Sequence, residues 1–444
     1  MTREPTAPDR PDQRVWCGQL DLAEGTGPAT VTVPGRFTAA RVLVRVHGEP
    51  VGYVTSGARV LDAAACRELL APQDRRRLEE HLAAEGLPVA GPVPAAGSRC
   101  PMVLTAFPPV TVVVCTRDRP ELVRSCLRHL TALTYPALSV LVVDNAPTDD
   151  RTARAVAETA GDDPRVEYVV EPLPGLSNAR NRGWTTARTE LVAYTDDDVT
   201  VEPDWVHGLV RGFQRRDDVG CVSGLVCSAS VEGAAEQYFD ARVSWSSAVA
   251  PRLYDMADQR GDGALFPYAP GVFGTGANFA FRREVLEAGG GFDPALGAGT
   301  RTGGGEDLDA FVLALLGGHA LAYEPSALVW HHHRSTLPEL RSQMYAYGTG
   351  LTAFLTKHVL DRRTRRHVLV RLLAGLRHGA GLAARTRRSL PAGVPAPEGL
   401  GRLELRGASA GPLLYLRARR ALPASARRVP APARAVPAGR PGTP

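Results

Sequence analysis

Three features that often locate or stabilise a protein are scarce in this sequence. Its seven cysteines show no paired C-x-x-C spacing, so we expect reduced thiols and no zinc site. No window approaches the run of roughly 18 apolar residues that a membrane-spanning helix needs. The first residues also lack the apolar core of a secretory signal peptide. These absences predict a cytoplasmic protein.

Lysine is almost absent as well, and basic charge gathers at one end. The only lysine, Lys357, opens a C-terminal region with 19 basic and 3 acidic residues, whereas the rest of the chain holds 33 basic and 44 acidic residues. A basic end on an acidic body predicts contact with an anionic surface. We expect peripheral contact with the inner face of the membrane and no nucleic acid. A solvated tail, whose arginines reflect only coding bias, is the alternative.

The sequence divides into five regions. Residues 1–37, rich in Pro, Gly, Asp and Thr, are expected to form a disordered or loosely packed tail, and residues 38–107 a small α+β module without a motif. Residues 108–335 alternate β-branched runs with helical stripes, which predicts an α/β fold whose mostly parallel sheet is flanked by helices. Amphipathic and basic helices should follow over 336–390, and a Pro-, Ala- and Arg-rich disordered tail over 391–444.

Three carboxylates end one predicted strand. The apolar run 191–194 is followed by Thr195 and then by Asp196, Asp197 and Asp198. Clustered acids at the end of a buried strand are costly unless a positive group meets them. In a parallel sheet that end is where ligands bind, and Mg²⁺ or Mn²⁺ shared with substrate phosphates is the natural partner. Capping of the next helix is the alternative reading for any one of them.

Acids follow two other predicted strands in the same way. Asp118 and Asp144 should share one rim of the sheet with Asp196, which predicts a nucleotide pocket. Taken singly, each could instead cap a helix, and Asp118 could cap the one that starts at Pro120.

Two later clusters also carry candidate chemistry. Glu306, Asp307 and Asp309 fall in the first turn of a predicted helix after three glycines. The helix dipole favours acids there, and a catalytic base at this position is the other interpretation. His331 and His333 follow a predicted strand on one face, which makes them candidates for a further metal ligand.

In their order along the chain, these pieces resemble family 2 of the inverting, nucleotide-sugar-dependent glycosyltransferases with the GT-A fold. The resemblance extends from Val110 to Arg334, about half of the chain. The matching pieces are residues 113–119, 142–145, 176–183, 194–198, 274–278 and 304–307, followed by the histidines.

The resemblance implies a nucleoside-diphosphate-sugar donor, a divalent cation (Mn²⁺ or Mg²⁺) and one transfer with inversion, of the hexosyltransferase type. The acceptor would be a hydroxyl-bearing glycan, lipid-linked sugar or small molecule. Processive members of the family carry a Q-x-x-R-W motif and membrane spans, and this sequence has neither. We therefore expect a non-processive enzyme.

Residue roles carry over position by position. Asp307 would be the base with Glu306 beside it, and Asp198 would bind the metal with His331 or His333. Because Asp197 is also acidic, the register of the D-x-D pair is open by one residue. Donor binding would involve Thr116, Arg117, Asp118, Asp144, Asn145, Asn178, Arg180, Asn181, Asp196 and Asp197, and acceptor binding Gly274, Thr275, Gly276 and Asn278.

Two other functions compete with this interpretation. A sugar-phosphate nucleotidyltransferase has a similar sheet, and residues 297–301 resemble its G-x-G-T-R loop. Here that loop comes some 180 residues after the first strand, with no lysine nearby to bind a triphosphate. A non-catalytic nucleotide-sugar-binding homologue would lack some of the site acids, and none is missing.

Overall fold

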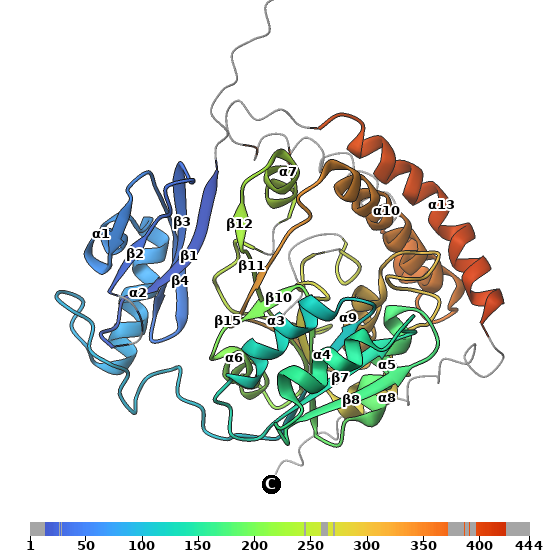
Figure 1. The fold of residues 1–444 in the computed structure, drawn as a ribbon, viewed down its shortest axis with the longest axis horizontal. Coiled ribbons are helices and arrows are strands. Elements are labelled where there is room, and N and C mark those ends of the chain that lie inside the picture. The colour runs from blue at the N-terminus through green and yellow to red at the C-terminus, as the bar shows by residue number, and fades with distance from the viewer. Residues whose placement is uncertain are drawn as a thin grey trace, which may run out of the picture.

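The large sheet organises the molecule (Figure 1). The computed structural model describes residues 14–25, 27, 29–243, 246–258, 265–269, 271–371, 386, 390 and 397–422. The strand order is β10-β15-β11-β14-β9-β6-β7-β8, with β13 also paired to β15. The bounds are β6 Val110–Thr116, β7 Leu138–Asn145, β8 Val166–Glu171, β9 Leu191–Asp196, β10 Val199–Val201, β11 Val219–Ser228, β13 Arg252–Tyr254, β14 Asn278–Arg282 and β15 Ala320–His331.

The predicted fold class is confirmed. Strands β8, β7, β6 and β9 are mutually parallel, and β11 and β15 run in the same direction beyond the antiparallel strand β14. Strand β6 is a run of β-branched residues buried on both faces, as expected for a central parallel strand. Antiparallel pairing of β10, β13 and β14 makes the sheet mixed.

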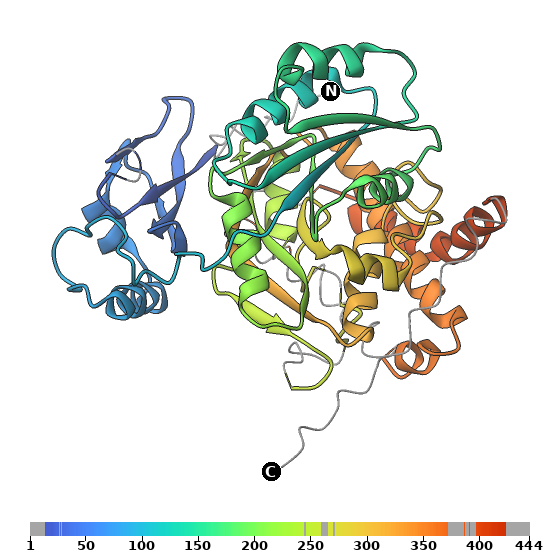
Figure 2. The ribbon, with the colours of Figure 1, turned by 90° about the horizontal axis from the view of Figure 1, so that it is seen from below.

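Helices cover both faces of this sheet. Alternate residues of β6 separate two cores: Val112 and Val114 pack with α3, α4 and α6, whereas Val113 packs with α5, α8 and α9. Figure 2 shows the layers from below. The helix bounds are α3 Pro120–Thr131, α4 Arg151–Ala160, α5 Leu176–Thr186, α6 Trp205–Gln214, α7 Ala234–Arg242, α8 Arg283–Gly289 and α9 Glu306–Leu316.

The start of the chain differs from the expected loose tail. Strand β1, Val15–Asp21, pairs in parallel with β3, Ala39–Val46, and antiparallel with β12, Ser230–Val231. These long-range pairings, together with burial of Cys17 and Leu20, fix a segment whose own composition is that of a loop. The prediction was therefore wrong for the strands in residues 14–37, and residues 1–13 lie outside the description.

A second, four-stranded sheet combines three strands of the N-terminal unit, defined here as the described residues from 14 to 104, with β12 from the rest of the chain. Its order is β12-β1-β3-β4, and helices pack beside it. Leu43 of this sheet packs with Leu225, Leu328 and Trp330 of β11 and β15, so the unit is docked on the large sheet. The remaining bounds are β2 Thr30–Thr32, β4 Glu49–Ser56, β5 Val60–Asp62, α1 Ala63–Leu69 and α2 Pro72–Glu85.

The C-terminal region also holds more structure than predicted. Helix α13, Leu400–Ala421, lies along α10, Leu337–Leu360, within the region expected to be a disordered tail (Figure 1). The two helices meet through glycines, because a Cβ at Gly348 would lie 2.0 Å from the Glu404 carbonyl oxygen and one at Gly407 2.2 Å from that of Tyr345. This close tertiary packing outweighs the Pro- and Arg-rich composition. Helix α11, Arg365–Leu369, follows α10.

No helix within the described residues is both long enough and apolar enough to cross a membrane.

Candidate functional site

Strand register brings the predicted rim acids to one edge of the sheet. Strand β6 lies between β7 and β9, and at its carboxyl end Thr116 pairs with Asp144 while Cys115 pairs with Asp196. Asp144 and Asp196 therefore flank the end of β6, from which residues 117–119 continue. This is the edge at which ligands bind in open α/β sheets.

The three consecutive acids do not share one environment. Asp197 is 4% exposed and accepts hydrogen bonds from Thr116 Oγ1 at 2.7 Å and from Arg119 Nη1 at 2.9 Å. Asp196 and Asp198 are only partly buried on either side of it. Internal hydrogen bonds thus occupy Asp197, whereas Arg119 lies 3.7 Å from Asp198 and Arg180 3.8 Å from Asp196. Arg119 was not among the predicted site residues.

Acid crowding is unfavourable without a counter-charge. Burial raises the pKa of Asp196, Arg180 opposes this shift, and the carboxylates of Asp198 and Asp197 add to it. Burial likewise raises the pKa of Asp197, against the opposing effect of Arg119. The Asp196 side chain remains 33% exposed, so a cation can reach it and relieve this cost.

Strand pairing also places a histidine against the acids. Val199 of β10 is opposite His331 of β15, and His331 Nε2 lies 3.6 Å from Asp198 Oδ1. The other ring nitrogen of His331, Nδ1, is 3.2 Å from His333 Nδ1. Both histidines were predicted as candidate metal ligands. In the structure His331 contacts Asp198, and His333 contacts His331.

The hydrogen bonds behind His333 determine the tautomers of both rings. Asp240 Oδ1 is 2.6 Å from Ser228 Oγ, so the hydroxyl donates to the carboxylate, and His333 Nε2–H donates to the same Oγ at 2.7 Å. His333 Nδ1 then accepts from His331 Nδ1–H, which leaves a lone pair on His331 Nε2 facing Asp198. Burial lowers the pKa of both histidines, that of His333 to about 3, which favours the neutral rings that this hydrogen-bond pattern requires.

The N-terminal unit anchors the far end of this chain of hydrogen bonds. Arg41 of β3 donates to both carboxylate oxygens of Asp240 at 2.7 and 2.8 Å. Because Asp240 is on α7 and Ser228 ends β11, side chains from three segments orient His331 through His333. Sequence reasoning missed Arg41, Ser228 and Asp240, since no local motif connects them.

At the β7 end of the rim, Asp144 is fully buried but incompletely satisfied. Tyr168 donates a hydrogen bond to Oδ2 at 2.8 Å, whereas Oδ1 has no partner among the described residues. Burial raises the pKa of Asp144. Asp118, at φ +54°, accepts from the backbone N–H and the hydroxyl of Thr148, and Arg117 is close to it at 3.9 Å. The loops after β6 and β7 are thereby tied together.

The predicted amides hold loops rather than standing free. Asn145 donates to the Leu173 carbonyl at 2.7 Å and accepts from Gly175 N–H at 2.8 Å. Asn181 donates to the Phe292 carbonyl and accepts from the Phe292 N–H and from Trp184. Asn178 donates to the Pro174 carbonyl. These three positions therefore shape the site through its backbone.

Arg180 connects four parts of the site from a buried position. Its guanidinium, 2% exposed, lies 2.8 Å from Glu306 Oε1, donates to the Gly276 carbonyl at 2.8 Å and lies 3.8 Å from Asp196 Oδ1. It thus joins α5, the start of α9, the glycine-rich segment and the triple acid. Burial raises the pKa of Glu306 to about 7, Arg180 opposes this shift, and Asp307 adds to it.

Removing Arg180 should therefore lower the stability of the protein as well as disturb the geometry of the site. The substitution Arg180→Met leaves Glu306 buried without its cation, which should lower the free energy of unfolding by about 3–5 kcal/mol. The double variant Arg180→Met/Glu306→Leu should recover most of that loss. Arg154→Met, at an ion pair with Asp150 whose arginine is 61% exposed, should cost no more than about 1 kcal/mol. Urea denaturation measures all three, and equal losses for Arg180→Met and Arg154→Met would contradict the assignment.

The two acids that begin α9 lie in different environments. Glu306 is held by Arg180, whereas Asp307 is only partly buried, and its Oδ2 would lie 3.1 Å from a Cβ added at Gly276. Gly276 therefore gives Asp307 a neighbour without a side chain. Gly274, at φ +106°, and Thr275, which accepts from the Ala277 N–H, form the preceding turn.

Asn278 does not fit its predicted acceptor role. It is completely buried, donates to the carbonyls of Leu225 and Ala327, and accepts from Trp205 Nε1. All of its hydrogen-bonding groups are thus used between strands and α6. Asn278 is the first residue of β14, and its side chain is buried between β14, its neighbouring strands and α6.

Comparisons with known proteins agree with the motifs. Residues 111–290 match the family described as Glycosyl transferase family 2. The glucosyl-dolichyl phosphate glucuronosyltransferase of Haloferax volcanii is 32% identical over 42% of this chain and 57% of its own. The succinoglycan biosynthesis protein ExoM of Rhizobium meliloti is 30% identical over 53% of this chain and 69% of its own.

Coverage of other proteins is less complete. The chain spans only 29% to 57% of the length of three curated relatives, the glucuronosyltransferase among them. Among solved structures, a mannosyltransferase from Pyrobaculum calidifontis, solved with GDP-Man and Mn²⁺, aligns with a TM-score of 0.48 at 22% identity, covering 69% of this chain and 88% of that chain. On the family match and the extent of the likeness to ExoM, the chain belongs to glycosyl transferase family 2.

Proposed function

We propose that this protein transfers a sugar from a nucleoside-diphosphate sugar to an acceptor hydroxyl, once per encounter and with inversion. The observation that carries the proposal is the shared edge on which Asp144, Asp196 and Asp198 lie, with His331 Nε2 3.6 Å from Asp198 Oδ1. Oxygen and imidazole donors beside crowded carboxylates suit a divalent cation that accompanies a diphosphate.

Asp198 and His331 Nε2 would hold that cation, Mn²⁺ or Mg²⁺. When bound, it would supply positive charge against the leaving diphosphate. His333 is a positioning residue in this proposal, because it fixes the tautomer and orientation of His331. Asp196, which faces both the cation site and Arg180, would contact the ribose or the sugar.

The nucleoside would lie along the β6 and β7 ends of the rim. The unpartnered Asp144 Oδ1 can accept an N–H or O–H from the base or ribose, which removes the cost of an unsatisfied buried acceptor. Thr116 supports this edge through Asp197, while Asp118 and Arg117 lie on the adjoining loop.

Asp307 would take the proton of the acceptor hydroxyl. Of the two acids at the start of α9, Asp307 alone forms no ion pair with a described residue, and it lies beside the backbone of Gly276. The deprotonated oxygen would attack the anomeric carbon from the side opposite the diphosphate, so one displacement inverts that carbon. Glu306 acts through Arg180 and is a positioning residue.

Internal contacts disfavour the nucleotidyltransferase alternative. Residues 297–301 are tied down locally, since the Ala298 carbonyl accepts from Leu176 N–H and Thr300 donates to the Gly297 carbonyl. The single lysine, Lys357, is paired with Asp309 and Asp293. Neither feature offers a triphosphate site.

We also propose peripheral membrane contact through α13. Its outer face exposes Leu405 (71%) and Leu413 (51%) beside Arg402, Arg406 and Arg417, a pattern that suits an anionic bilayer surface.

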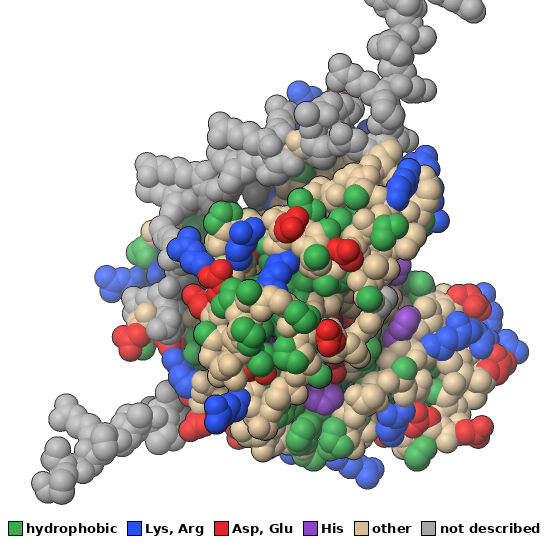
Figure 3. All heavy atoms as spheres, turned by 90° about the vertical axis from the view of Figure 1, so that its left-hand side faces the viewer, with side chains coloured by type: hydrophobic (Ala, Val, Ile, Leu, Met, Phe, Trp, Pro, Cys, Tyr) green, Lys and Arg blue, Asp and Glu red, His purple; other side chains and the backbone are tan. Residues whose placement is uncertain are grey.

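On the face with the N-terminal unit toward the viewer, acidic and basic side chains are interspersed (Figure 3), unlike a nucleic-acid-binding stripe.

The double variant Leu405→Asp/Leu413→Asp should lose co-sedimentation with phosphatidylglycerol vesicles and keep its melting temperature, because both side chains are exposed. Neutral phosphatidylcholine vesicles are the control. Unchanged binding of the variant to the anionic vesicles would contradict membrane contact through α13.

A thermal-shift screen of nucleotide sugars, with and without Mn²⁺, tests the proposed activity. At least one donor should raise the melting temperature only when Mn²⁺ is present; at 100 times its dissociation constant a ligand stabilises by about 2.7 kcal/mol. If no nucleotide sugar shifts the transition under either condition, the donor site is wrongly assigned.

A further inference from the structure

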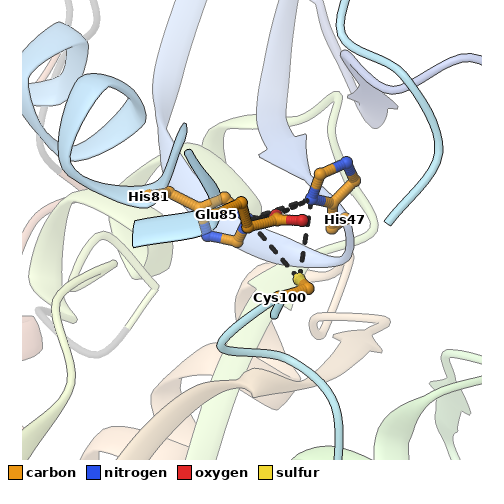
Figure 4. A group of neighbouring side chains, drawn as sticks. All are labelled: His47, His81, Glu85 and Cys100. Atoms are coloured by element: carbon orange, nitrogen blue, oxygen red, sulfur yellow. Dashed lines mark hydrogen bonds and ion pairs between the residues drawn. The ribbon is translucent and has the colours of Figure 1, made fainter. Parts of the chain in front are cut away.

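A second cluster of metal-binding side chains lies inside the N-terminal unit, remote in sequence from the rim acids. It consists of His47, His81, Glu85 and Cys100 (Figure 4). His47 is in the turn between β3 and β4, and His81 and Glu85 lie one helical turn apart on α2. Cys100 belongs to the segment that leads to β6. The side chains of His47, His81 and Glu85 are at most 2% exposed, and Cys100 is 3% exposed.

The four donor atoms lie within 4.8 Å of one another, and the nitrogen–sulfur distances are those expected around one ion. His47 Nδ1 and His81 Nε2 are 3.0 Å apart, and they lie 2.5 and 2.9 Å from Glu85 Oε1. Cys100 Sγ is 3.6 Å from the first nitrogen and 3.7 Å from the second. With Zn–N near 2.0–2.1 Å and Zn–S near 2.3 Å, a tetrahedral site separates nitrogen from sulfur by roughly 3.6 Å.

The outer hydrogen bonds show which ring atoms face inward with a lone pair. His47 Nε2 is 2.8 Å from the Pro94 carbonyl, which can only accept, so this nitrogen carries the proton. His81 Nδ1 is 2.5 Å from the Glu49 carboxylate and carries its proton for the same reason. In the neutral rings, His47 Nδ1 and His81 Nε2 then carry lone pairs that point toward Glu85 Oε1 and toward each other.

Lone pairs that converge in a buried space repel one another unless a positive charge lies between them. A second proton on His81 alone would let Nε2 donate to Glu85 Oε1 or to His47 Nδ1 but not to both groups fully, and protonation of both rings would bury two cations with their nitrogens 3.0 Å apart. A metal ion satisfies all four groups at once. Backing of each imidazole by a carbonyl or carboxylate is also the usual outer shell of metal-bound histidine.

We propose that His47, His81, Glu85 and Cys100 bind a structural zinc ion. Two imidazoles, a thiolate and a carboxylate form a closed set of four protein ligands, which is typical of structural rather than catalytic zinc. The unpaired spacing of the seven cysteines predicted no zinc site. The visible signal is only the His81-x-x-x-Glu85 spacing on one face of α2, and the other two ligands come from distant segments.

The ion would fix the path of the chain between the N-terminal unit and the large sheet. Beyond Cys100, the carbonyls of Met102 and Ala106 accept hydrogen bonds from Arg211 and Gln214 of α6. On the other side of the cluster, the Val93 carbonyl accepts from Glu24 N–H beyond β1. One ligand group thus ties the β3–β4 turn, α2 and this connecting segment together.

The metal content of the intact chain tests the proposal. Protein produced in zinc-supplemented medium and purified without a metal-affinity step should hold stoichiometric zinc by mass spectrometry. Zinc replaced by Co²⁺ should give the visible absorption of tetrahedral cobalt with a sulfur ligand. Cys100→Ser and His81→Ala should lose the metal, and a chelator should lower the melting temperature of the wild type but not of Cys100→Ser.

Two controls separate metal binding from mere destabilisation. Cys66→Ser changes another buried cysteine of the same unit and should keep its zinc. Asp198→Ala, at the rim of the large sheet, should also keep it, which makes this site independent of the proposed transferase activity. Wild-type protein that takes up neither zinc nor cobalt, or stoichiometric zinc in both Cys100→Ser and His81→Ala, would overturn the proposal.

Discussion

Asp307→Asn should retain nucleotide-sugar binding and lose sugar transfer by about 10²–10⁴-fold, the range that a positioned general base supplies. The substitution keeps the size of the side chain next to Gly276 and removes only its basicity. Because Glu306 and not Asp307 pairs with Arg180, the buried ion pair of the site remains. The loss should therefore fall on kcat, with the donor dissociation constant unchanged.

A matched control addresses the other reading of Asp307, stabilisation of a helix dipole. Glu284 is an exposed acid in the first turn of α8, so Glu284→Gln removes a comparable charge from a comparable helix position. That variant should transfer sugar normally. Near-normal turnover in Asp307→Asn, with the donor and acceptor saturating, would remove Asp307 from the mechanism.

Asp198→Ala should abolish metal-dependent donor binding. Loss of an outer hydrogen-bonding partner alone costs roughly 10- to 100-fold in metal affinity, so loss of a ligand should weaken Mn²⁺-dependent binding at least about 100-fold. Calorimetric titration of the donor with and without Mn²⁺ measures this directly. Asp197 keeps its bonds to Thr116 and Arg119, so the variant should fold.

A control variant tests whether that effect is specific to Asp198. Asp217→Ala changes an exposed acid between α6 and β11 and should leave binding unaltered. Metal-dependent affinity that survives in Asp198→Ala would show that the cation is held elsewhere on the rim.

Local patterns were enough to predict the large sheet and its rim. The β-branched run of β6 and the helical stripe of α3 each identify their element without tertiary information, and the acids at the carboxyl ends of β7 and β9 lie at one edge of the sheet. The different environments of the three consecutive acids could not be read locally. They depend on Arg119, which pairs with Asp197, and that contact crosses from one loop to another.

Features built from distant segments escaped prediction for the same reason. Strand β1 is defined by partners at Ala39 and Val231 rather than by its own composition. Helix α13 depends on glycine contacts with α10, and its Pro412 lies inside the helix. The orientation of His331 depends on Ser228, Asp240 and Arg41, which no motif connects.

The placement of the cation and the nucleotide on the rim is tested most directly by anomalous diffraction. Crystals of the intact chain should be grown with Mn²⁺ and the nucleoside diphosphate that the thermal-shift screen selects. At the manganese edge, a peak should lie within bonding distance of Asp198 and His331 Nε2, with the nucleoside beside Asp144. A manganese peak away from both residues, or a nucleotide bound on another face, would contradict the proposed donor site.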